Sequence, residues 1–114
     1  MTQRISFNNK VFKLVQNSDH GSASNQTKFV YKQEGNLVTA DYYGGDIRYG
    51  KIIAELKDEK LHIVYQCMTL ANELKCGKAL ADITLDDDTG KIKLKLNWEW
   101  LTSQEKGTSE YIEV

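Results

Sequence analysis

Residues 91–102 alternate between apolar and polar side chains, and this pattern constrains the fold more than any other feature of the chain. The polar positions carry lysine, asparagine or glutamate, and the apolar ones are Ile92, Leu94, Leu96, Trp98 and Trp100. A period of two residues is that of a strand with one buried face, so the stretch predicts a half-buried β-strand. Its apolar face needs a matching surface, which the rest of the chain has to supply.

Seven further segments have the same strand character. With the stretch just described, the expected strands are residues 11–16, 26–33, 37–43, 46–56, 61–70, 73–85, 91–102 and 108–114. The connections are mostly short, and no segment keeps a helical period for more than one turn. Short connections make sequence neighbours into neighbours in space, which indicates an antiparallel meander. Closing such a sheet removes both of its exposed edges.

We therefore expect an all-β chain with little or no helix. Its eight strands should form an antiparallel up-and-down meander closed into a barrel, as a single domain over residues 1–114. The interior of such a barrel is just wide enough for side chains or for one small ligand.

The charge balance limits the partners that this chain can attract. Fifteen basic and sixteen acidic residues give a net charge of -1, so we expect neither nucleic acid nor a membrane as a partner. The first nine residues lack the apolar run of a secretory signal, which favours a cytoplasmic location. Cys67 and Cys76 are then expected to be free thiols. A cross-strand disulfide or redox switch is the alternative if the two lie opposite each other.

Three short turns set the expected pairing of the central strands. A two-residue turn at Gly44-Gly45 would place Asp41 opposite Arg48. A turn at residues 58–59 would place Leu56 opposite Leu61 and Gly50 opposite Cys67. A turn at residues 71–72 would place Cys67 opposite Cys76 and Tyr65 opposite Lys78. The predicted lining of the barrel is then Thr39, Asp41, Arg48, Ile52, Tyr65, Cys67, Cys76, Lys78 and Leu80.

A charged patch inside a barrel suggests a binding site, because an unpaired buried charge is costly. We expect the charged side chains to anchor a polar or anionic ligand group and the tryptophans to form flat walls. The candidate ligand-binding residues are Asp41, Arg48, Tyr65, Lys78, Trp98 and Trp100.

Two structural alternatives stay open for these residues. A slip of one residue in the pairing would return the charges to solvent, and the tryptophans would then be core fillers. Ile47, Tyr49 and Ile53 form an equally apolar opposite face on their strand. Asp82 and Ile83 break the alternation of theirs and suggest a bulge.

Catalytic and metal-binding motifs are missing from the sequence. No serine lies in a nucleophile elbow, and no glycine-rich loop leads into a helix. His20 and His62 lie far apart without partners at ligand spacing, and the acidic run at residues 86–88 lacks the distal glutamate of a calcium loop. We expect no metal and no cofactor, and we favour a protein that is not an enzyme.

Several turn glycines and strand aromatics carry a resemblance to a known family. They are Tyr43-Gly44-Gly45, Ile47, Gly50, Tyr65-Gln66, Gly90-Lys91-Ile92, Trp98, Trp100, Gly107, Ser109 and Glu113. Over residues 37–114 the chain resembles small bacterial proteins of about this length that often carry the label N-acetylglutamate synthase. That family commonly has a His-Glu pair before its tryptophans, whereas Lys95 and Leu96 stand here. The chain also resembles lipocalin-like and streptavidin-like barrels, which implies binding of one small molecule.

Three classes of function follow from these features. The leading one is a barrel that binds a small molecule inside or at its mouth without catalysis. The second is the enzyme that the family label implies, which would transfer an acetyl group to glutamate. The third is a filled barrel that acts through its outer surface, as a homodimer or an accessory protein.

Overall fold

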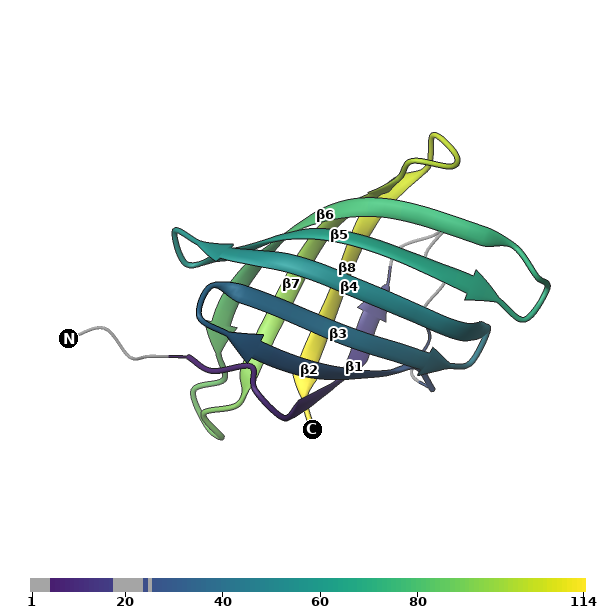
Figure 1. Ribbon diagram of the computed structural model, residues 1–114. Helices are drawn as coiled ribbons and strands as arrows, with labels where there is room; N and C mark the ends of the chain where they lie inside the picture. Colours follow the sequence, from purple (N-terminus) through teal and green to yellow (C-terminus); the bar gives the residue numbers. More distant parts are fainter. Residues whose placement is uncertain (1–4, 18–23, 25) are drawn as a thin grey trace.

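Eight β-strands form the molecule shown in Figure 1, a computed structural model that describes residues 5–17, 24 and 26–114. The strands are β1 (Lys10–Asn17), β2 (Lys28–Glu34), β3 (Leu37–Gly44), β4 (Ile47–Lys57), β5 (Lys60–Thr69), β6 (Leu74–Leu85), β7 (Ile92–Trp100) and β8 (Lys106–Glu113). Over these ranges we find no helix that could cross a membrane. The predicted loop at residues 17–22, with His20, falls almost entirely outside the described residues.

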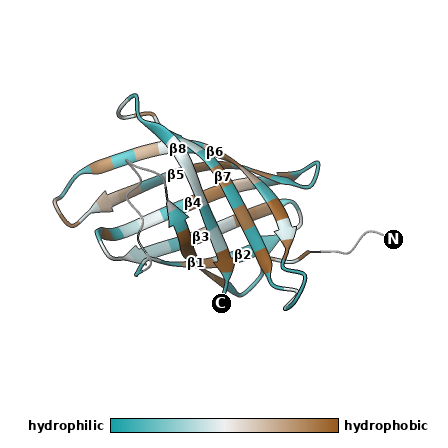
Figure 2. Cartoon of the chain, turned by 180° about the vertical axis from the view of Figure 1, so that it is seen from behind, coloured by the Kyte–Doolittle hydropathy of each residue, from teal (hydrophilic) through white to brown (hydrophobic). Residues whose placement is uncertain are grey.

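The sheet is a closed barrel in which each strand pairs antiparallel with its neighbours in sequence. The first and last strands complete the ring, with Leu14 of β1 opposite Tyr111 of β8. The predicted eight-stranded up-and-down barrel is therefore confirmed. Figure 2 shows why this strand closes into the barrel with one face inward: hydrophobic and hydrophilic residues alternate along β7. The hydrophobic set faces the interior, and closure joins the edges that an open sheet would expose.

The two ends of the barrel differ. At one end, which we call the closed end, residues 5–9 and the C-terminus lie beside the β2–β3, β4–β5 and β6–β7 connections. Phe7 plugs this end, since its ring is fully buried against Phe12 and Tyr31 and its backbone N–H donates to Oε1 of Gln33 at 2.8 Å. The opposite end, which we call the mouth, carries the β3–β4, β5–β6 and β7–β8 connections (Figure 1).

The pairing of β4 with β5 agrees with the sequence prediction. Leu56 lies opposite Leu61 and Gly50 opposite Cys67. The connecting turn has Asp58 and Glu59 at φ 54° and 63°, the left-handed pair of a type I′ hairpin.

The predicted pairing at the other two turns is wrong. Gly44 pairs with Ile47 rather than lying inside the turn, and the register shifts nearby, so Asp41 lies opposite Lys51 instead of Arg48. At the mouth end of β5 the chain turns through more residues than predicted, with the N–H of Thr69 donating to the carbonyl of Glu73. One residue of slip moves a whole strand to the other face.

The longer β5–β6 turn shifts the pairing of β6 with β5 by one residue from the predicted register. Tyr65 lies opposite Gly77 instead of Lys78, and Cys67 lies opposite Lys75 instead of Cys76. The predicted bulge at Asp82 and Ile83 is also wrong, because the pairing of β6 with β7 runs through both residues without a shift, and the pairing with β5 reaches Asp82 without one. Asp82 faces outward, where its carboxylate lies 3.2 Å from the ammonium of Lys60.

Candidate functional site

The six predicted ligand-binding residues divide between the two faces of the sheet. Tyr65, Trp98 and Trp100 point into the barrel and are 9%, 6% and 6% exposed. Arg48 and Lys78 are exposed on the outer face. The prediction that these charges line the interior is wrong. The slip at the β5–β6 turn puts Lys78 on the outer face, and a register shift in β4 between Ile47 and Tyr49 puts Arg48 there.

Asp41 also belongs to the outer face. Its carboxylate accepts hydrogen bonds from the hydroxyl of Tyr49 at 2.6 Å and from the ammonium of Lys51 at 3.0 Å. These contacts hold the pKa of Asp41 below its ordinary value, the tyrosine bond contributing most. Of the other predicted lining residues, Ile52 and Cys67 do face inward and are buried. Thr39, Cys76 and Leu80 lie on the outward positions of their strands.

Two groups of aromatic rings line the interior toward the mouth. In the first, Tyr65 meets Trp100 edge to face with ring centroids 5.2 Å apart, and Trp98 lies 6.2 Å from Trp100. In the second, Phe29 stacks on Tyr42 at 4.8 Å and meets Tyr111 edge to face at 4.9 Å. Separations of this size are those of favourable ring pairs. The wall is therefore flat, apolar and polarizable.

Two tyrosines of this wall cross over glycines. The ring of Tyr42 lies over Gly50, its partner on the next strand, and its hydroxyl donates to the carbonyl of Gln66 at 3.1 Å. The ring of Tyr65 lies over Gly77 in the same way and donates to the carbonyl of Glu99 at 3.1 Å. Each tyrosine thus ties three neighbouring strands together. A glycine inside a predicted strand was the available signal for such close approach.

The tyrosine hydroxyls and the indole N–H groups of the aromatic wall carry no charge at neutral pH. Burial raises the pKa of Tyr42 and of Tyr65 far above the ordinary value, and it raises the pKa of Tyr111 to about 12. These phenols therefore stay protonated at neutral pH. The indole Nε1–H of Trp98 donates to Oγ of Ser109 at 2.8 Å, which fixes the orientation of that ring.

Sequence reasoning missed one charged residue on this inner wall, Lys75. It shares a face of β6 with Gly77 and Ala79, and its Nζ lies 4.8 Å from the ring centroid of Trp100. The missed signal was the length of the β5–β6 turn, which decides whether position 75 or position 76 faces inward.

The two cysteines occupy opposite faces of the sheet and are both free, as predicted. Cys67 is buried inside the barrel, where burial raises the pKa of its thiol. Cys76 occupies an outward position on β6 and is partly exposed. A disulfide between them would have to cross the sheet, which disulfide geometry does not allow.

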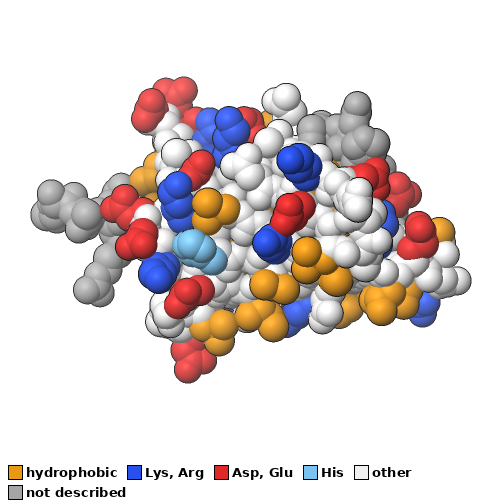
Figure 3. Space-filling view, turned by 90° about the horizontal axis from the view of Figure 1, so that it is seen from above, with side chains coloured by type: hydrophobic (Ala, Val, Ile, Leu, Met, Phe, Trp, Pro, Cys, Tyr) orange, Lys and Arg blue, Asp and Glu red, His pale blue; other side chains and the backbone are white. Residues whose placement is uncertain are grey.

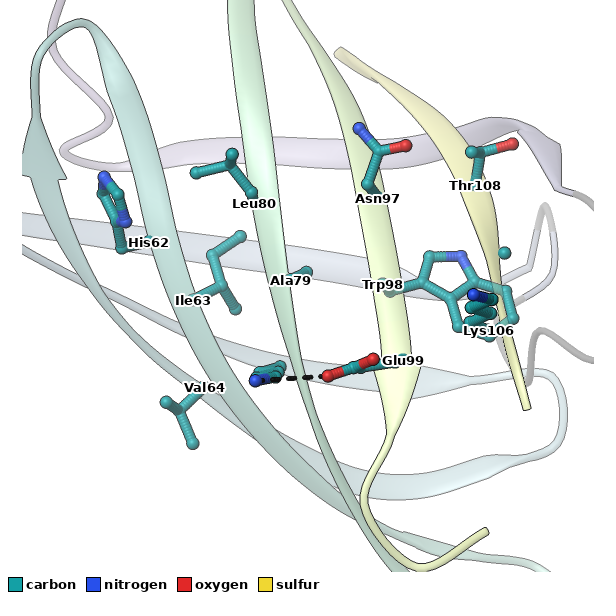
Figure 4. A pocket seen from close by; sticks show the side chains of 12 residues that line it. His62, Ile63, Val64, Ala79, Leu80, Asn97, Trp98, Glu99, Lys106 and Thr108 are labelled. Carbon is teal, nitrogen blue, oxygen red and sulfur yellow. Dashed lines mark ion pairs between the residues drawn. The ribbon is translucent and has the colours of Figure 1, made fainter. Parts of the chain in front are cut away.

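The outer face of β5–β8 carries a shallow concavity of about 690 Å³. Figure 4 shows His62, Leu80, Asn97 and Thr108 as one row across it, with Glu99 in the next row. The carboxylate of Glu99 forms an ion pair with the ammonium of Lys78 at 3.2 Å. Figure 3 shows this side of the molecule, where apolar side chains are interspersed with charges of both signs. Exposed ion pairs of this kind stabilise little.

No group of three or more histidine, cysteine or acidic side chains in the described parts of the chain is arranged to hold a metal ion.

The sequence was also compared with known proteins. No curated protein and no solved structure gave a match. The model of one family, described as Avidin-like protein, matches residues 5–114. This range includes all eight strands and both aromatic groups. The chain therefore belongs to the Avidin-like protein family.

Proposed function

We propose that this protein binds one small organic molecule at the mouth of its barrel and does not convert it chemically. The observation that carries the proposal is the group of inward rings formed by Tyr65, Trp98 and Trp100. Membership of the Avidin-like family supports a binding role for a barrel of this size.

The difference between the two ends indicates where the ligand enters. At the closed end Phe7, Phe12 and Leu61 are completely buried, so side chains already fill that space. Toward the mouth, the inward rings keep 5–9% of their surface accessible. A ligand would therefore enter between the β3–β4, β5–β6 and β7–β8 connections and lie against the tryptophans.

The chemistry of the wall favours a flat and largely apolar ligand. The hydroxyls of Tyr42 and Tyr65 already donate to main-chain carbonyls, and the indole of Trp98 donates to Ser109. Ring stacking against the faces of Trp98 and Trp100 is the main interaction that such a wall offers. The proposal leaves out Asp41, Arg48 and Lys78, because their side chains lie on the outer face.

Tryptophan fluorescence provides the test, since both tryptophans of the chain lie in the proposed site. A metabolite library should contain compounds that change the emission saturably, and Trp98→Phe should weaken their binding at least tenfold. Lys78→Met, on the outer face of the same barrel, should leave the affinity unchanged. The proposal fails if no compound in the library changes the emission saturably, or if Lys78→Met weakens binding as much as Trp98→Phe does.

The other two classes of function have their own tests. Acetyl transfer from acetyl-CoA to glutamate above background would replace the binding proposal with the activity that the synthase label implies. A homodimer would support the third class, and light scattering during gel filtration measures the mass directly. We propose a cytoplasmic location, in keeping with two free thiols, and cell fractionation tests it.

A further inference from the structure

We propose that a second copy of this chain docks on the outer face of β3–β6 and forms a dimer whose two-fold axis runs between β4 and β5, parallel to these strands. The inference goes beyond the proposed function and does not depend on it, because the docking face lies on the outside of the barrel. The mouth lies at the end of the barrel and stays open in such a dimer.

The outer face of these four strands carries a group of apolar side chains, which we call the outer apolar patch. Ile53 and Val64 form its centre, since they pair directly across β4 and β5 and are 54% and 61% exposed. The other members lie on outward positions nearby and are Leu37, Tyr49, Met68, Leu74 and Leu80. Figure 3 shows hydrophobic side chains close together along the lower edge of that view. Single exposed apolar residues are normal, whereas a contiguous patch is typical of an interaction site.

Strand pairing arranges the outward residues of β3–β6 in rows that cross the four strands. In order from β3 to β6, the rows are Leu37, Glu55, His62 and Leu80; Thr39, Ile53, Val64 and Lys78; and Asp41, Lys51, Gln66 and Cys76. A two-fold axis parallel to the strands keeps each row level and reverses its direction. Each residue of β4 therefore faces a residue of β5 in the second copy, and each residue of β3 faces one of β6.

The rows complement themselves under this reversal. The apolar contacts are Leu37 with the partner's Leu80, Ile53 with the partner's Val64, and Tyr49 with the partner's Met68. The polar contacts are Glu55 with the partner's His62, Thr39 with the partner's Lys78, Lys51 with the partner's Gln66, and Asp41 with the partner's Cys76. Apolar side chains thus meet apolar ones, and no charge meets another of the same sign, which would be destabilising. A face that matches itself in this way fits a second copy of the chain.

Charge also favours a second copy over a lipid surface. The ammonium of Lys51 lies 3.0 Å from the carboxylate of Asp41, and that of Lys78 lies 3.2 Å from that of Glu99. These pairs leave the face without the excess of positive charge that an anionic bilayer attracts. The net charge of -1 causes little repulsion between two copies.

The size of the face sets the expected strength of the dimer. Two sheet faces pack about 10 Å apart, so side chains of both outer faces can touch. The rows of four strands supply fewer residues than the roughly 20–30 per partner of a standard interface. We therefore expect a weak dimer, with a dissociation constant on the order of 10 µM.

Val15 provides a matched control for Val64. The two valines are 59% and 61% exposed, and Val15 lies on β1, on the opposite side of the closed ring from β5. Substitution by lysine adds one positive charge at an exposed strand position in either case. Only Val64→Lys places that charge in the outer apolar patch.

Sedimentation velocity from about 1 to 300 µM, a range around the expected constant, measures the mass of wild type and of each variant. Circular dichroism verifies that each variant is folded. Wild type and Val15→Lys should dimerise with the same constant. Val64→Lys and Ile53→Glu should each weaken the dimer by more than about tenfold, because each sets two charges against apolar side chains of the partner. An equimolar mixture of the Ile53→Glu and Val64→Lys proteins should dimerise again, since the introduced charges of opposite sign then face each other across the axis.

Three results would overturn the inference. The first is a wild type that stays monomeric over this range, and co-sedimentation of that monomer with phosphatidylcholine vesicles would assign the patch to lipid instead. The second is a dimer that Val15→Lys weakens as much as Val64→Lys does, because the copies would then meet through another face. The third is a mixture of Ile53→Glu and Val64→Lys proteins that stays monomeric, because the two-fold axis would then lie elsewhere. Ligand affinity, measured by tryptophan fluorescence, should be the same in Val64→Lys as in wild type, so failure of the dimer leaves the proposed function standing.

Discussion

Gly50 should not tolerate a methyl group, although it lies inside a strand where alanine is normally accepted. A Cβ added at Gly50 would lie 2.1 Å from Cζ of Tyr42 and 2.4–2.5 Å from two further ring carbons. Carbon atoms in contact are about 3.5–4.0 Å apart, so the ring would have to retreat by more than about 1 Å.

The retreat of this ring has two costs. Tyr42 stacks on Phe29 at 4.8 Å, so its movement disturbs the packing of the second aromatic group. Its hydroxyl would also leave the carbonyl of Gln66. Overpacking costs about 1–3 kcal/mol and a buried unsatisfied hydroxyl about 1–3 kcal/mol, so Gly50→Ala should destabilise by about 2–6 kcal/mol. Without the ring above it, the same substitution would stabilise by about 0.4–1 kcal/mol, through the entropy of the unfolded chain.

The sign of the change in stability is therefore diagnostic. Urea unfolding followed by tryptophan fluorescence measures it in Gly50→Ala, Tyr42→Ala and the double variant. Once the ring is absent, the methyl group has room, so the double variant should be more stable than the sum of the single changes predicts. The reasoning is refuted if Gly50→Ala is as stable as wild type, or if the two changes are additive. Gly77→Ala should also destabilise, because the added Cβ would lie 2.4 Å from the hydroxyl oxygen of Tyr65 and 2.4 Å from the main-chain carbonyl oxygen of Glu99; removal of the Tyr65 ring would relieve only the first of these contacts.

Three further predictions concern a turn, the thiols and acid stability. Glu59→Gly should stabilise the protein by about 1 kcal/mol in urea unfolding, because glycine relieves a φ of 63° in the β4–β5 turn; an unchanged midpoint would contradict this. A thiol reagent should label Cys76 in the native protein and Cys67 only after denaturation, and fewer than two thiols in the denatured protein would refute it. A hydrogen bond from the backbone N–H of Ile92 lowers the pKa of Glu113, so this carboxylate should stabilise the fold above the ordinary glutamate pKa, and the contribution should disappear as the pH falls through the lowered value. Glu113→Gln should accordingly reduce the loss of stability on acidification, and an unaltered pH profile would disprove the assignment.

The crossing tyrosines also bear on binding. Tyr42 and Tyr65 are held over their glycines by hydrogen bonds to the main chain of a third strand, so their rings are fixed in the absence of ligand. A wall whose rings are already ordered loses less conformational entropy on binding. Substitution of either glycine should therefore weaken the binding of a ligand, even where the ligand makes no direct contact with the substituted residue.

Much of the fold was determined by local sequence. Alternation in each segment fixed which residues of that strand share a face, so Trp98 and Trp100 were correctly expected to lie together. Turn residues fixed the number of strands and their antiparallel order, and the β4–β5 turn fixed its own register. These features need no information beyond a few neighbouring residues, because the side-chain period of a strand is set by its own backbone.

The tertiary structure decided which of two faces each strand turns inward. At the β3–β4 and β5–β6 turns this depended on single residues, such as Gly44 in the ladder and Asn72 with φ 64°, whose conformations respond to contacts from other strands. One residue of slip between β5 and β6 turned Lys78 outward and Lys75 inward, and a register shift in β4 between Ile47 and Tyr49 turned Arg48 outward. The alternation of side chains along a strand is a local property of its backbone. The register of the strand is not local, because it depends on hydrogen bonds to the partner strand and on packing across the closed barrel.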